Sequence, residues 1–472
     1  MAEDRTAIIV LVAIFVIGIG LRVGSLSGDL WVDEIWSLNQ IAVARASGAG
    51  RDWIALYFHD NTHAVNTAFL TVLGPDAPMW TYRLLSMICG VGTMAVAAAI
   101  GWRRAPWEGV LLAGLTALSY PLVHYAGEAR GYGPMLLAAY LAFWLLEKFL
   151  DRRSAASLAG FVAACLFGFL SHLTFAVVLA GLGLWAAVAI YNQQRSIVST
   201  AARLVPLFGV PLIAVVAYGV IALNNFVIGG VTFVPAAQSV GIMTALTFGL
   251  DPAWISPPMT AAAFGLAGVA GIAWLGLNGD RRWPVFLVVV IVFPLGAILA
   301  ERQPYVLPRY LLAAAPFALI LASHGLAVLW AHKGWKRALS GLLIAAFCLG
   351  NASLLSDFFR AGRGNYGAAI ADMAAATAGT IRVAGAPAFS VGTMFRYHVR
   401  RLGLGRRFQF VAKRGQTKKP ADWFILGYLD ALNAPPELTR PAASGPSAAY
   451  GLVSVYPHWG LSGDTWAVYR RR

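Results

Sequence analysis

The sequence predicts a polytopic α-helical membrane protein with about eleven transmembrane helices, a cytoplasmic N-terminus and a small C-terminal α/β or α+β domain. Hydrophobic residues make up 59% of the 472 residues and charged residues only 12%, whereas a soluble globular domain carries about 25% charged residues. Apolar stretches long enough to cross a bilayer recur along the chain. The last part of the chain is more polar and more basic. These features exclude an ordinary soluble enzyme and a disordered chain.

Candidate transmembrane spans follow from the apolar runs, since a spanning helix needs about 20 mostly apolar residues. The first run begins after a short polar N-terminus and has no small-residue cleavage site before Arg22, so we expect a retained span rather than a signal peptide. The candidate spans are 7–21, 80–101, 107–122, 133–147, 157–172, 174–191, 204–223, 260–277, 284–300, 309–330 and 338–356.

The basic residues test this count and predict the orientation. With the N-terminus in the cytoplasm, every predicted inside loop carries at least two basic residues, as the positive-inside rule requires. These residues are Arg103, Arg104, Lys148, Arg152, Arg153, Arg195, Arg203, Arg281, Arg282, Lys333, Lys336 and Arg337. An odd number of spans then places the C-terminal region outside. We therefore expect a transmembrane catalytic domain over 1–356 and a basic extracytoplasmic soluble domain over 357–472, in the bacterial cytoplasmic (inner) membrane.

Two predicted outside segments are too long to be simple connections. The loop 22–79 contains two apolar or amphipathic stretches, Asp33–Ala46 and His63–Gly74, which we expect to be interfacial helices. The segment Asn224–Pro258 contains the apolar run Val240–Leu250 and is expected to fold over the membrane face as a lid.

The C-terminal domain holds +10 of the total net charge of +15. This excess favours contact with anionic lipid headgroups or acidic glycans, and no nucleic-acid motif accompanies it. We predict a helix over Tyr366–Ala378 and loops over Lys413–Pro420 and Ala434–Pro446. The predicted strands include Trp423–Leu426, Leu452–Tyr456 and Trp466–Tyr469.

An acidic pair, Asp33 and Glu34, follows the first span. Adjacent carboxylates among Trp31, Ile35 and Trp36 are costly at a membrane interface unless they are solvated, paired or bound to a cation. Partial desolvation would raise a carboxylate's pKa and make it a better base. The alternative is a helix start with Asp33 as the N-cap.

Two further groups lie on the same predicted outer face. The stretch His124–Tyr132 contains His124, Glu128, Arg130 and Tyr132 in an apolar setting. Arg130 could grip a phosphate and Glu128 could orient it, whereas the alternative is an interfacial ion pair with aromatic anchors.

The third group, Arg302–Tyr310, ends in Arg309 and Tyr310 at a helix start, where an anion would meet backbone amides. The alternative is a snorkelling arginine beside an interfacial tyrosine.

A fourth group consists of His59, Asp60, His63 and Asn66, close to one helical face. His59 and His63 are weak candidates for a divalent metal, and binding of donor or acceptor hydroxyls is the favoured interpretation. His172, at the outer end of a span, is a spare candidate, although a satisfied interfacial histidine is the favoured interpretation. The sequence contains no GxxxxGK[ST] P-loop and no HExxH motif, which disfavours a P-loop ATPase.

The order of these motifs resembles the GT-C glycosyltransferases, specifically the bacterial branch similar to protein O-mannosyltransferases and the lipid A aminoarabinose and galacturonic acid transferases. The residues that carry the resemblance are Leu30–Glu34, Glu128–Tyr132 and Arg309–Leu312, and the pattern covers about 1–356. Family members often have His-Pro-Pro-Leu-Tyr-Tyr where this chain has His63-Ala64-Val65-Asn66-Thr67-Ala68, so that only the histidine is retained.

The resemblance implies a GT-C fold and an inverting transfer of a sugar from a polyprenyl-phosphate donor to an acceptor hydroxyl on a lipid, glycan or protein of the cell envelope. It implies that Asp33 is the general base, with Glu34 contacting a substrate or a metal. Arg130 and Arg309, assisted by Glu128, Tyr132 and Tyr310, would hold the donor phosphate. No cofactor is required by the resemblance, and a divalent metal is left open.

Two alternatives remain at this point. A transporter or flippase of lipid-linked sugars would use the outer charges as a gate, although transporters place ionisable groups near the bilayer midplane. A surface-glycan polymerase or ligase would instead use a diphosphate-linked oligosaccharide.

Overall fold

The computed structural model describes residues 2–47, 56–57, 63–222, 234–300, 306–411, 420–428, 434–440 and 447–472. The chain forms two units. The helical unit contains Met1–Leu26, Gly48–Leu73 and Thr81–Leu355. The sheet unit contains Ser27–Ser47, Gly74–Trp80 and Ser356–Arg472. The C-terminal sheet thus groups with segments of the first outside loop that a linear division at residue 356 had assigned to the membrane region.

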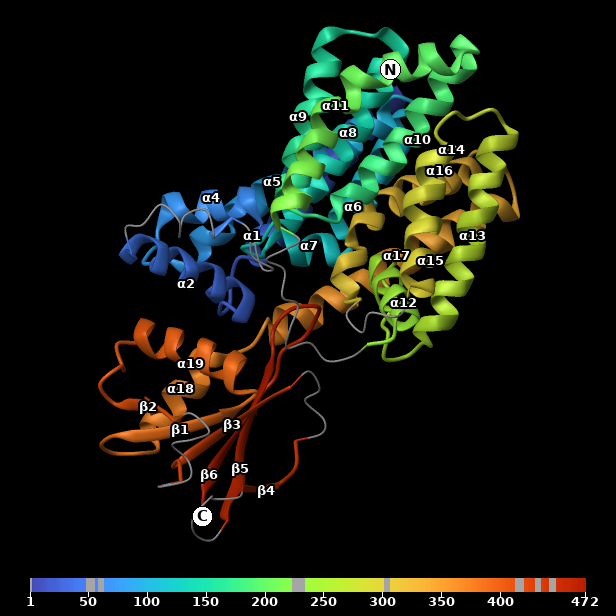
Figure 1. The fold of residues 1–472 in the computed structure, drawn as a ribbon. Helices are drawn as coiled ribbons and strands as arrows, with labels where there is room; N and C mark the ends of the chain where they lie inside the picture. The colour runs from blue at the N-terminus through green and yellow to red at the C-terminus, as the bar shows by residue number, and fades with distance from the viewer. Residues whose placement is uncertain are drawn as a thin grey trace. The chain divides into compact units, whose positions relative to one another are not determined.

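The helical unit is built from long apolar helices (Figure 1). Its first half contains α1 (Ala2–Gly24), α4 (Ala64–Leu73), α5 (Leu84–Trp102), α6 (Pro106–Leu118), α7 (Tyr120–Ala126), α8 (Tyr132–Arg152), α9 (Ala155–Ser171) and α10 (Phe175–Gln194). The 3₁₀ turn η1 (Met79–Arg83) leads into α5. The second half contains α11 (Ile197–Ala222), α12 (Ala236–Thr247), α13 (Pro257–Leu277), α14 (Trp283–Phe286), the π-helical η3 (Leu287–Val292), α15 (Phe293–Leu299), the 3₁₀ turn η4 (Pro308–Ala314), α16 (Ala315–Ala331) and α17 (Trp335–Ala361).

Each of the eleven predicted spans falls mainly on one helix or on two or three consecutive helical elements. Within the residues that the structure describes, eight helices are long and apolar enough to cross a membrane, or nine if the bent pair α6–α7 is one span. The two remaining candidates are the shorter apolar helices Ala155–Ser171 and Trp283–Leu299. The chain is a multi-pass membrane protein, and the exact count of eleven and the orientation stay predictions.

The bend between α6 and α7 positions the loop that carries Glu128 and Arg130. The two helices meet at 62°, and the break leaves the last carbonyls of α6 without helical partners. The buried Arg22 guanidinium of α1 donates to the carbonyls of Thr116 and Ala117 at 3.0 and 3.1 Å. Asn351 Oδ1 accepts the amide of Tyr120 at 2.7 Å. These hydrogen bonds pair the backbone groups that the break leaves without helical partners, and they hold α7 in place.

The sheet unit combines one mixed sheet with helices. Its helices are α2 (Val32–Ser47), α18 (Tyr366–Ala375) and α19 (Ala388–Arg401). Its strands are β1 (Ile381–Ala386), β2 (Phe408–Phe410), β3 (Trp423–Tyr428), β4 (Glu437–Arg440), β5 (Ala448–Tyr456) and β6 (Thr465–Arg471). The strand order is β2-β1-β3-β6-β5-β4, parallel from β2 to β3 and antiparallel from β3 to β4.

The segment before α2 is anchored inside the sheet unit. Asp29 Oδ2 accepts the amide of Gly367 at the N-terminus of α18 at 2.7 Å, where the helix dipole favours a carboxylate. The buried His398 of α19 bonds through Nε2 to the carbonyl of Leu30 at 3.0 Å. Trp36 of α2 meets Phe389 of α19 edge to face, with ring centroids 5.5 Å apart. The sheet unit therefore fixes the start of α2, which carries the acidic pair.

The local predictions for the C-terminal region hold in part. The predicted helix and the three predicted strands correspond to α18, β3, β5 and β6. The predicted loop Ala434–Pro446 is wrong over Glu437–Arg440, which pairs with β5 as the edge strand β4. The predicted loop Lys413–Pro420 lies outside the described residues except for Pro420. The predicted interfacial stretches form α2 and α4, and the predicted lid contains α12, but their placement at a membrane surface stays a prediction.

Candidate functional site

The loop between α7 and α8 places three predicted site residues in the interior of the helical unit. Glu128, Arg130 and Tyr132 are only 1%, 5% and 1% exposed. The loop packs closely because of Gly131, where a Cβ would lie 1.8 Å from the Ser171 carbonyl oxygen. Glycine is therefore required at this position, and it lets Arg130 and Tyr132 approach the α9–α10 connection.

Arg130 is held by His63, which precedes α4. Arg130 Nε donates to His63 Nε2 at 3.0 Å, and Arg130 Nη2 lies 2.8 Å from the same nitrogen. His63 Nδ1 lies 3.1 Å from the Ser171 carbonyl oxygen, which requires the proton on Nδ1. His63 is therefore neutral, and its Nε2 accepts hydrogen bonds from the guanidinium group of Arg130. Burial, followed by the charges of Arg130, His172 and Arg309, holds the pKa of His63 well below 6.5.

Aromatic rings pack next to His63 and Arg130. His172 stacks on His63 with ring centroids 4.9 Å apart, and Tyr132 lies 4.5 Å from both His172 and Tyr125. The hydroxyl groups of Tyr125 and Tyr132 are buried and have no hydrogen-bond partner among the described residues. A buried hydroxyl without a partner costs free energy unless a ligand or water completes it. Both hydroxyls are thus available to an incoming ligand.

Arg309 belongs to the same cluster. It lies on η4 and acts electrostatically on His63, His172, Tyr125 and Tyr132. Its guanidinium carbon is 5.9 Å from the ring centroid of Tyr310. The tight 3₁₀ geometry of η4, begun by Pro308, differs from the regular helix start that the sequence suggests. We refer to His63, Tyr125, Arg130, Tyr132, His172 and Arg309 as the Arg130 cluster.

The acidic pair lies on α2 in the sheet unit. Glu34 is fully buried, and its Oε2 accepts the backbone N–H of Trp31 at 3.3 Å, which is the N3 half of a capping box. Asp33 is half-buried in the first turn, and its carbonyl accepts a hydrogen bond from Ser37 Oγ. Trp31 rather than Asp33 therefore occupies the N-cap position, and the alternative interpretation of Asp33 as the N-cap is wrong. The two carboxylates differ in role as well as in burial.

The remaining predicted residues are placed as follows. Asn66 Nδ2 donates to the Ala129 carbonyl at 2.8 Å and so supports the loop that carries Arg130. The fully buried His124 lies 3.2 Å through Nδ1 from the hydroxyl of Tyr120. His59 and Asp60 lie outside the described residues. Both ring nitrogens of His63 are engaged within the described residues. Because His59 and Asp60 lie outside those residues, the metal candidacy of His59 and His63 stays a prediction.

The cluster contains two residues that the sequence did not favour as site residues. His172, expected to be a satisfied interfacial histidine, does bond to Thr174 Oγ1 at 2.8 Å, but its ring also forms one wall of the cluster. Tyr125 lies within the predicted stretch His124–Tyr132, but the sequence gives it no role of its own. Their local sequence gives no signal of this role, because each is brought to Arg130 by contacts between different helices.

The arrangement defines a class of site. Two guanidinium groups and two tyrosine hydroxyls converge in a buried, aromatic environment, which is suited to an oxyanion such as a phosphate. The surrounding fold is that of a multi-pass membrane protein with a small C-terminal sheet unit.

The chain is similar in fold to a protein of solved structure. The chain is similar to ArnT from Cupriavidus metallidurans in the apo state, with 13% sequence identity and a TM-score of 0.52 over 99% of this chain and 98% of that chain. It is also similar to ArnT from the same organism bound to undecaprenyl phosphate, with 12% identity and a TM-score of 0.49 over 98% and 97% of the two chains. No protein-family model and no curated protein sequence matches the chain. The fold that the motif resemblance implies is thereby confirmed.

Proposed function

We propose that the protein is an inverting glycosyltransferase that moves a sugar from a polyprenyl-phosphate donor to an acceptor hydroxyl at the outer face of the cytoplasmic membrane. The observation that carries the proposal is the Arg130 cluster. Arg130 and Arg309 come from loops more than 170 residues apart in sequence, yet both act on the same buried histidine. Their convergence in an apolar helical unit favours a ligand that combines a phosphate with a lipid chain.

In this proposal the cluster binds the donor phosphate. His63 orients the guanidinium group of Arg130, because its neutral Nε2 accepts hydrogen bonds from two nitrogens of that group. Arg309 supplies the second positive charge, and the Tyr125 and Tyr132 hydroxyls supply donors that the described residues leave unsatisfied. Charge that develops on the leaving phosphate is stabilised most strongly by such preorganised donors in a site shielded from water.

The chemical step follows from the resemblance to GT-C enzymes. Asp33 removes the proton from the acceptor hydroxyl, whose oxygen attacks the anomeric carbon from the face opposite the phosphate. The carbon–oxygen bond to the phosphate breaks, and the polyprenyl phosphate leaves with the electron pair. The configuration at the anomeric carbon is inverted. Glu34 holds the first turn of α2, so we assign it the positioning of Asp33 rather than proton transfer.

The lipid that copurifies with the protein tests the donor class. We expect mass spectrometry of the protein, purified in mild detergent, to detect a polyprenyl monophosphate with or without one sugar. Arg309→Gln should lower the retained amount at least about tenfold, since a hydrogen bond to a charged group contributes about 1.5–3 kcal/mol. Arg152→Gln, an exposed arginine at the other end of α8, should retain the lipid like the wild type.

Other outcomes separate the alternatives. A diphosphate-linked oligosaccharide in place of the monophosphate would favour a polymerase or ligase. Translocation of a lipid-linked sugar without formation of a glycosidic bond would favour a flippase. Equal retention of the monophosphate by the wild type and Arg309→Gln would remove the Arg130 cluster as the phosphate site.

A further inference from the structure

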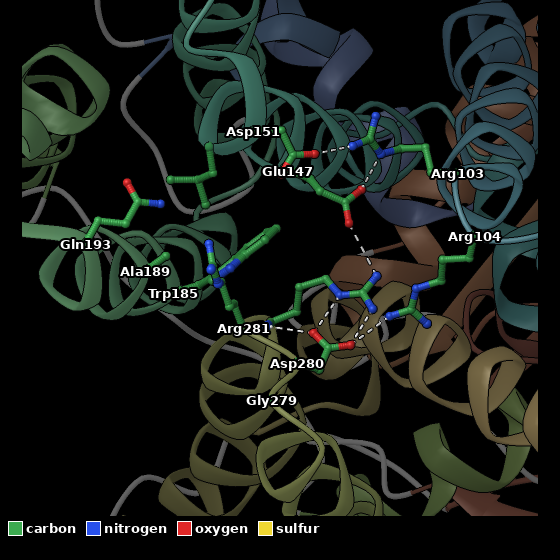
Figure 2. Close-up of a pocket in the computed structure, with 12 residues that line it drawn as sticks. Arg103, Arg104, Glu147, Asp151, Trp185, Ala189, Gln193, Gly279, Asp280 and Arg281 are labelled. Atoms are coloured by element: carbon green, nitrogen blue, oxygen red, sulfur yellow. Dashed lines mark hydrogen bonds and ion pairs between the residues drawn. The ribbon is translucent and has the colours of Figure 1, made fainter.

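A second polar site lies at the other end of α8 from the Arg130 cluster. α8 runs from Tyr132 to Arg152 over 21 residues, which is about 30 Å of helix and close to the thickness of a bilayer core. At its far end the structure contains a cavity of about 390 Å³, a volume typical of small-ligand sites. The connections α5–α6 and α13–α14 and one face of α10 complete its wall (Figure 2).

One side of this cavity is a continuous network of alternating charges. Arg103 bonds to Asp151 at 2.5 Å and to Glu147 at 2.8 Å. Arg282 lies 3.3 Å from Glu147 and donates through Nε to Asp280 at 2.8 Å. The network continues from Asp280 to Arg104 at 3.0 Å. Figure 2 shows these contacts as one chain of dashed lines. Each of these carboxylates is therefore bound to an arginine, and each of these arginines to a carboxylate.

The other side of the cavity contains two donors that the network does not use. Trp185 is 2% exposed, and its indole N–H is buried without an acceptor among the described residues. Arg281 lines the same cavity and makes no ion pair or hydrogen bond within the described part of the chain. A buried indole N–H without an acceptor is rare and requires an explanation. An acceptor that enters the cavity would satisfy it.

The charge of the lining specifies what kind of acceptor fits. Four arginines and three carboxylates line the cavity, and Arg104 also pairs with Glu108 behind the lining at 2.9 Å. Arg281 is the lining arginine that has no carboxylate partner among the described residues. A phosphodiester carries one negative charge and has free oxygens that accept from a guanidinium and from an indole N–H at once. The apolar side chains of Leu150 and Ala189 also line the cavity, as expected beside the glycerol and first methylenes of a lipid.

We propose that this cavity is a phosphodiester-binding site, with the headgroup of an anionic glycerophospholipid as its ligand. Arg281 and Trp185 contact the phosphodiester. The network of ion pairs described above preorganises the surrounding loops. The site is independent of sugar transfer, because none of its residues belongs to the Arg130 cluster. Since the arginines of this cavity lie in loops that the positive-inside rule assigns to the cytoplasm, the lipid would come from the inner leaflet.

Native mass spectrometry of the delipidated full-length protein tests the proposal with two probes, phosphatidylglycerol and the soluble diester glycerophosphoglycerol. We expect one phosphatidylglycerol to bind with a higher affinity than any others. Arg281→Gln should weaken that binding at least about tenfold, and Trp185→Phe should weaken it severalfold. Arg281 is exposed, so its substitution leaves the packing of the helices unchanged.

Arg195→Gln is the matched control, because Arg195 is an exposed arginine at the end of α10 that does not line the cavity. Arg195→Gln should bind like the wild type. Binding of the soluble diester with the same dependence on Arg281 and Trp185 would support the phosphodiester site and identify a soluble source. Equal binding of phosphatidylglycerol by the wild type, Arg281→Gln and Trp185→Phe would overturn the proposal.

Discussion

At the scale of single residues, the histidine that supports Arg130 is as informative as the arginine itself. A protonated His63 could not accept from a guanidinium, so the observed contacts define both its tautomer and its charge. A neutral histidine beside two arginines costs less free energy than a third cation would at the same place. The histidine also aligns the guanidinium plane of Arg130. The cluster thereby concentrates positive charge where a phosphate would bind, without adding a charge that titrates near neutral pH.

The hydroxyl of Tyr132 provides a sharp test of ligand binding. Tyr132→Phe removes a buried hydroxyl that has no partner in the described residues, so we expect the stability of the ligand-free protein to stay the same or rise. Binding of a polyprenyl phosphate should weaken about three- to tenfold, because a donor to the phosphate is lost. Titration of the purified protein with the lipid, together with thermal unfolding, measures both effects.

Tyr140 supplies the control on the same helix. Its buried hydroxyl lies 3.0 Å from Thr116 Oγ1, so Tyr140→Phe should lower stability and leave lipid affinity unchanged. Unchanged lipid affinity in Tyr132→Phe would contradict the assignment of this hydroxyl to the phosphate.

The neutral state of His63 predicts a pH dependence of stability. Its pKa in the folded protein is well below the ordinary value of 6.5, so the unfolded chain takes up a proton at a higher pH than the folded chain does. The stabilisation from neutral His63 is therefore complete above about pH 6.5 and declines as the pH falls below that value. Thermal unfolding of the wild type and His63→Gln between pH 7.5 and 5 measures it. The variant should lose stability less steeply, and identical slopes would show that His63 does not titrate in this way.

At the scale of secondary-structure elements, the bend between α6 and α7 decides where the site forms. Arg22 donates to carbonyls of α1 and α6, including Gly18 at 3.1 Å, and Gly90 packs against its side chain. The arginine thus satisfies the carbonyl end of one helix from a neighbouring helix. α7 then begins at a fixed angle and leads directly into the loop that carries Arg130.

Arg22→Met should therefore affect the site from a distance. The carbonyls of Gly18, Thr116 and Ala117 lose their donor, and we expect a net loss of about 2–3 kcal/mol in the free energy of unfolding. Lipid affinity should fall in the same variant, because the orientation of α7 is no longer fixed. Arg5→Met, an exposed position on the same helix, should change neither quantity. Wild-type stability in Arg22→Met would show that the bend does not depend on this arginine.

The sequence predicted the long helices well and the elements of the C-terminal region only in part, for physical reasons. Apolar runs of membrane length identify helices without tertiary information, so every predicted span lies on helical residues. α19 was not predicted, because its many arginines obscure the apolar pattern of the sequence. Its buried face includes Val391, Met394 and Phe395. β4 reads as a loop, since an edge strand such as Glu437–Arg440 has a polar composition.

The candidate site shows the same limit. Arg130, Tyr132 and Arg309 stand out because polar side chains are rare in this chain and all three were placed on one face by the topology. Tyr125 and His172 do not stand out, because tyrosine and histidine are common at membrane interfaces. Their participation depends on helix packing that brings residues 63, 125 and 172 together, which periodicity within one segment does not encode.

At the scale of the whole molecule, the two units carry different parts of the proposed chemistry. The helical unit contains the Arg130 cluster, whereas Asp33 starts a helix that the sheet unit anchors through Asp29 and His398. The basic C-terminal region thus has a structural relation to the proposed base that its charge alone did not suggest. The excess positive charge of residues 357–472 is predicted to attract an anionic acceptor or anionic headgroups.

Sugar release from a labelled donor tests the central claim most directly. The assay follows the conversion of a radiolabelled polyprenyl-phosphate sugar to polyprenyl phosphate in membranes that contain the wild type or Asp33→Asn. We predict acceptor-dependent turnover by the wild type and a loss of at least about a hundredfold in Asp33→Asn, since general-base catalysis contributes about 10²–10⁴. Both proteins should unfold at the same temperature. Comparable turnover by a correctly folded Asp33→Asn, or none by the wild type with any lipid-linked sugar, would contradict the account.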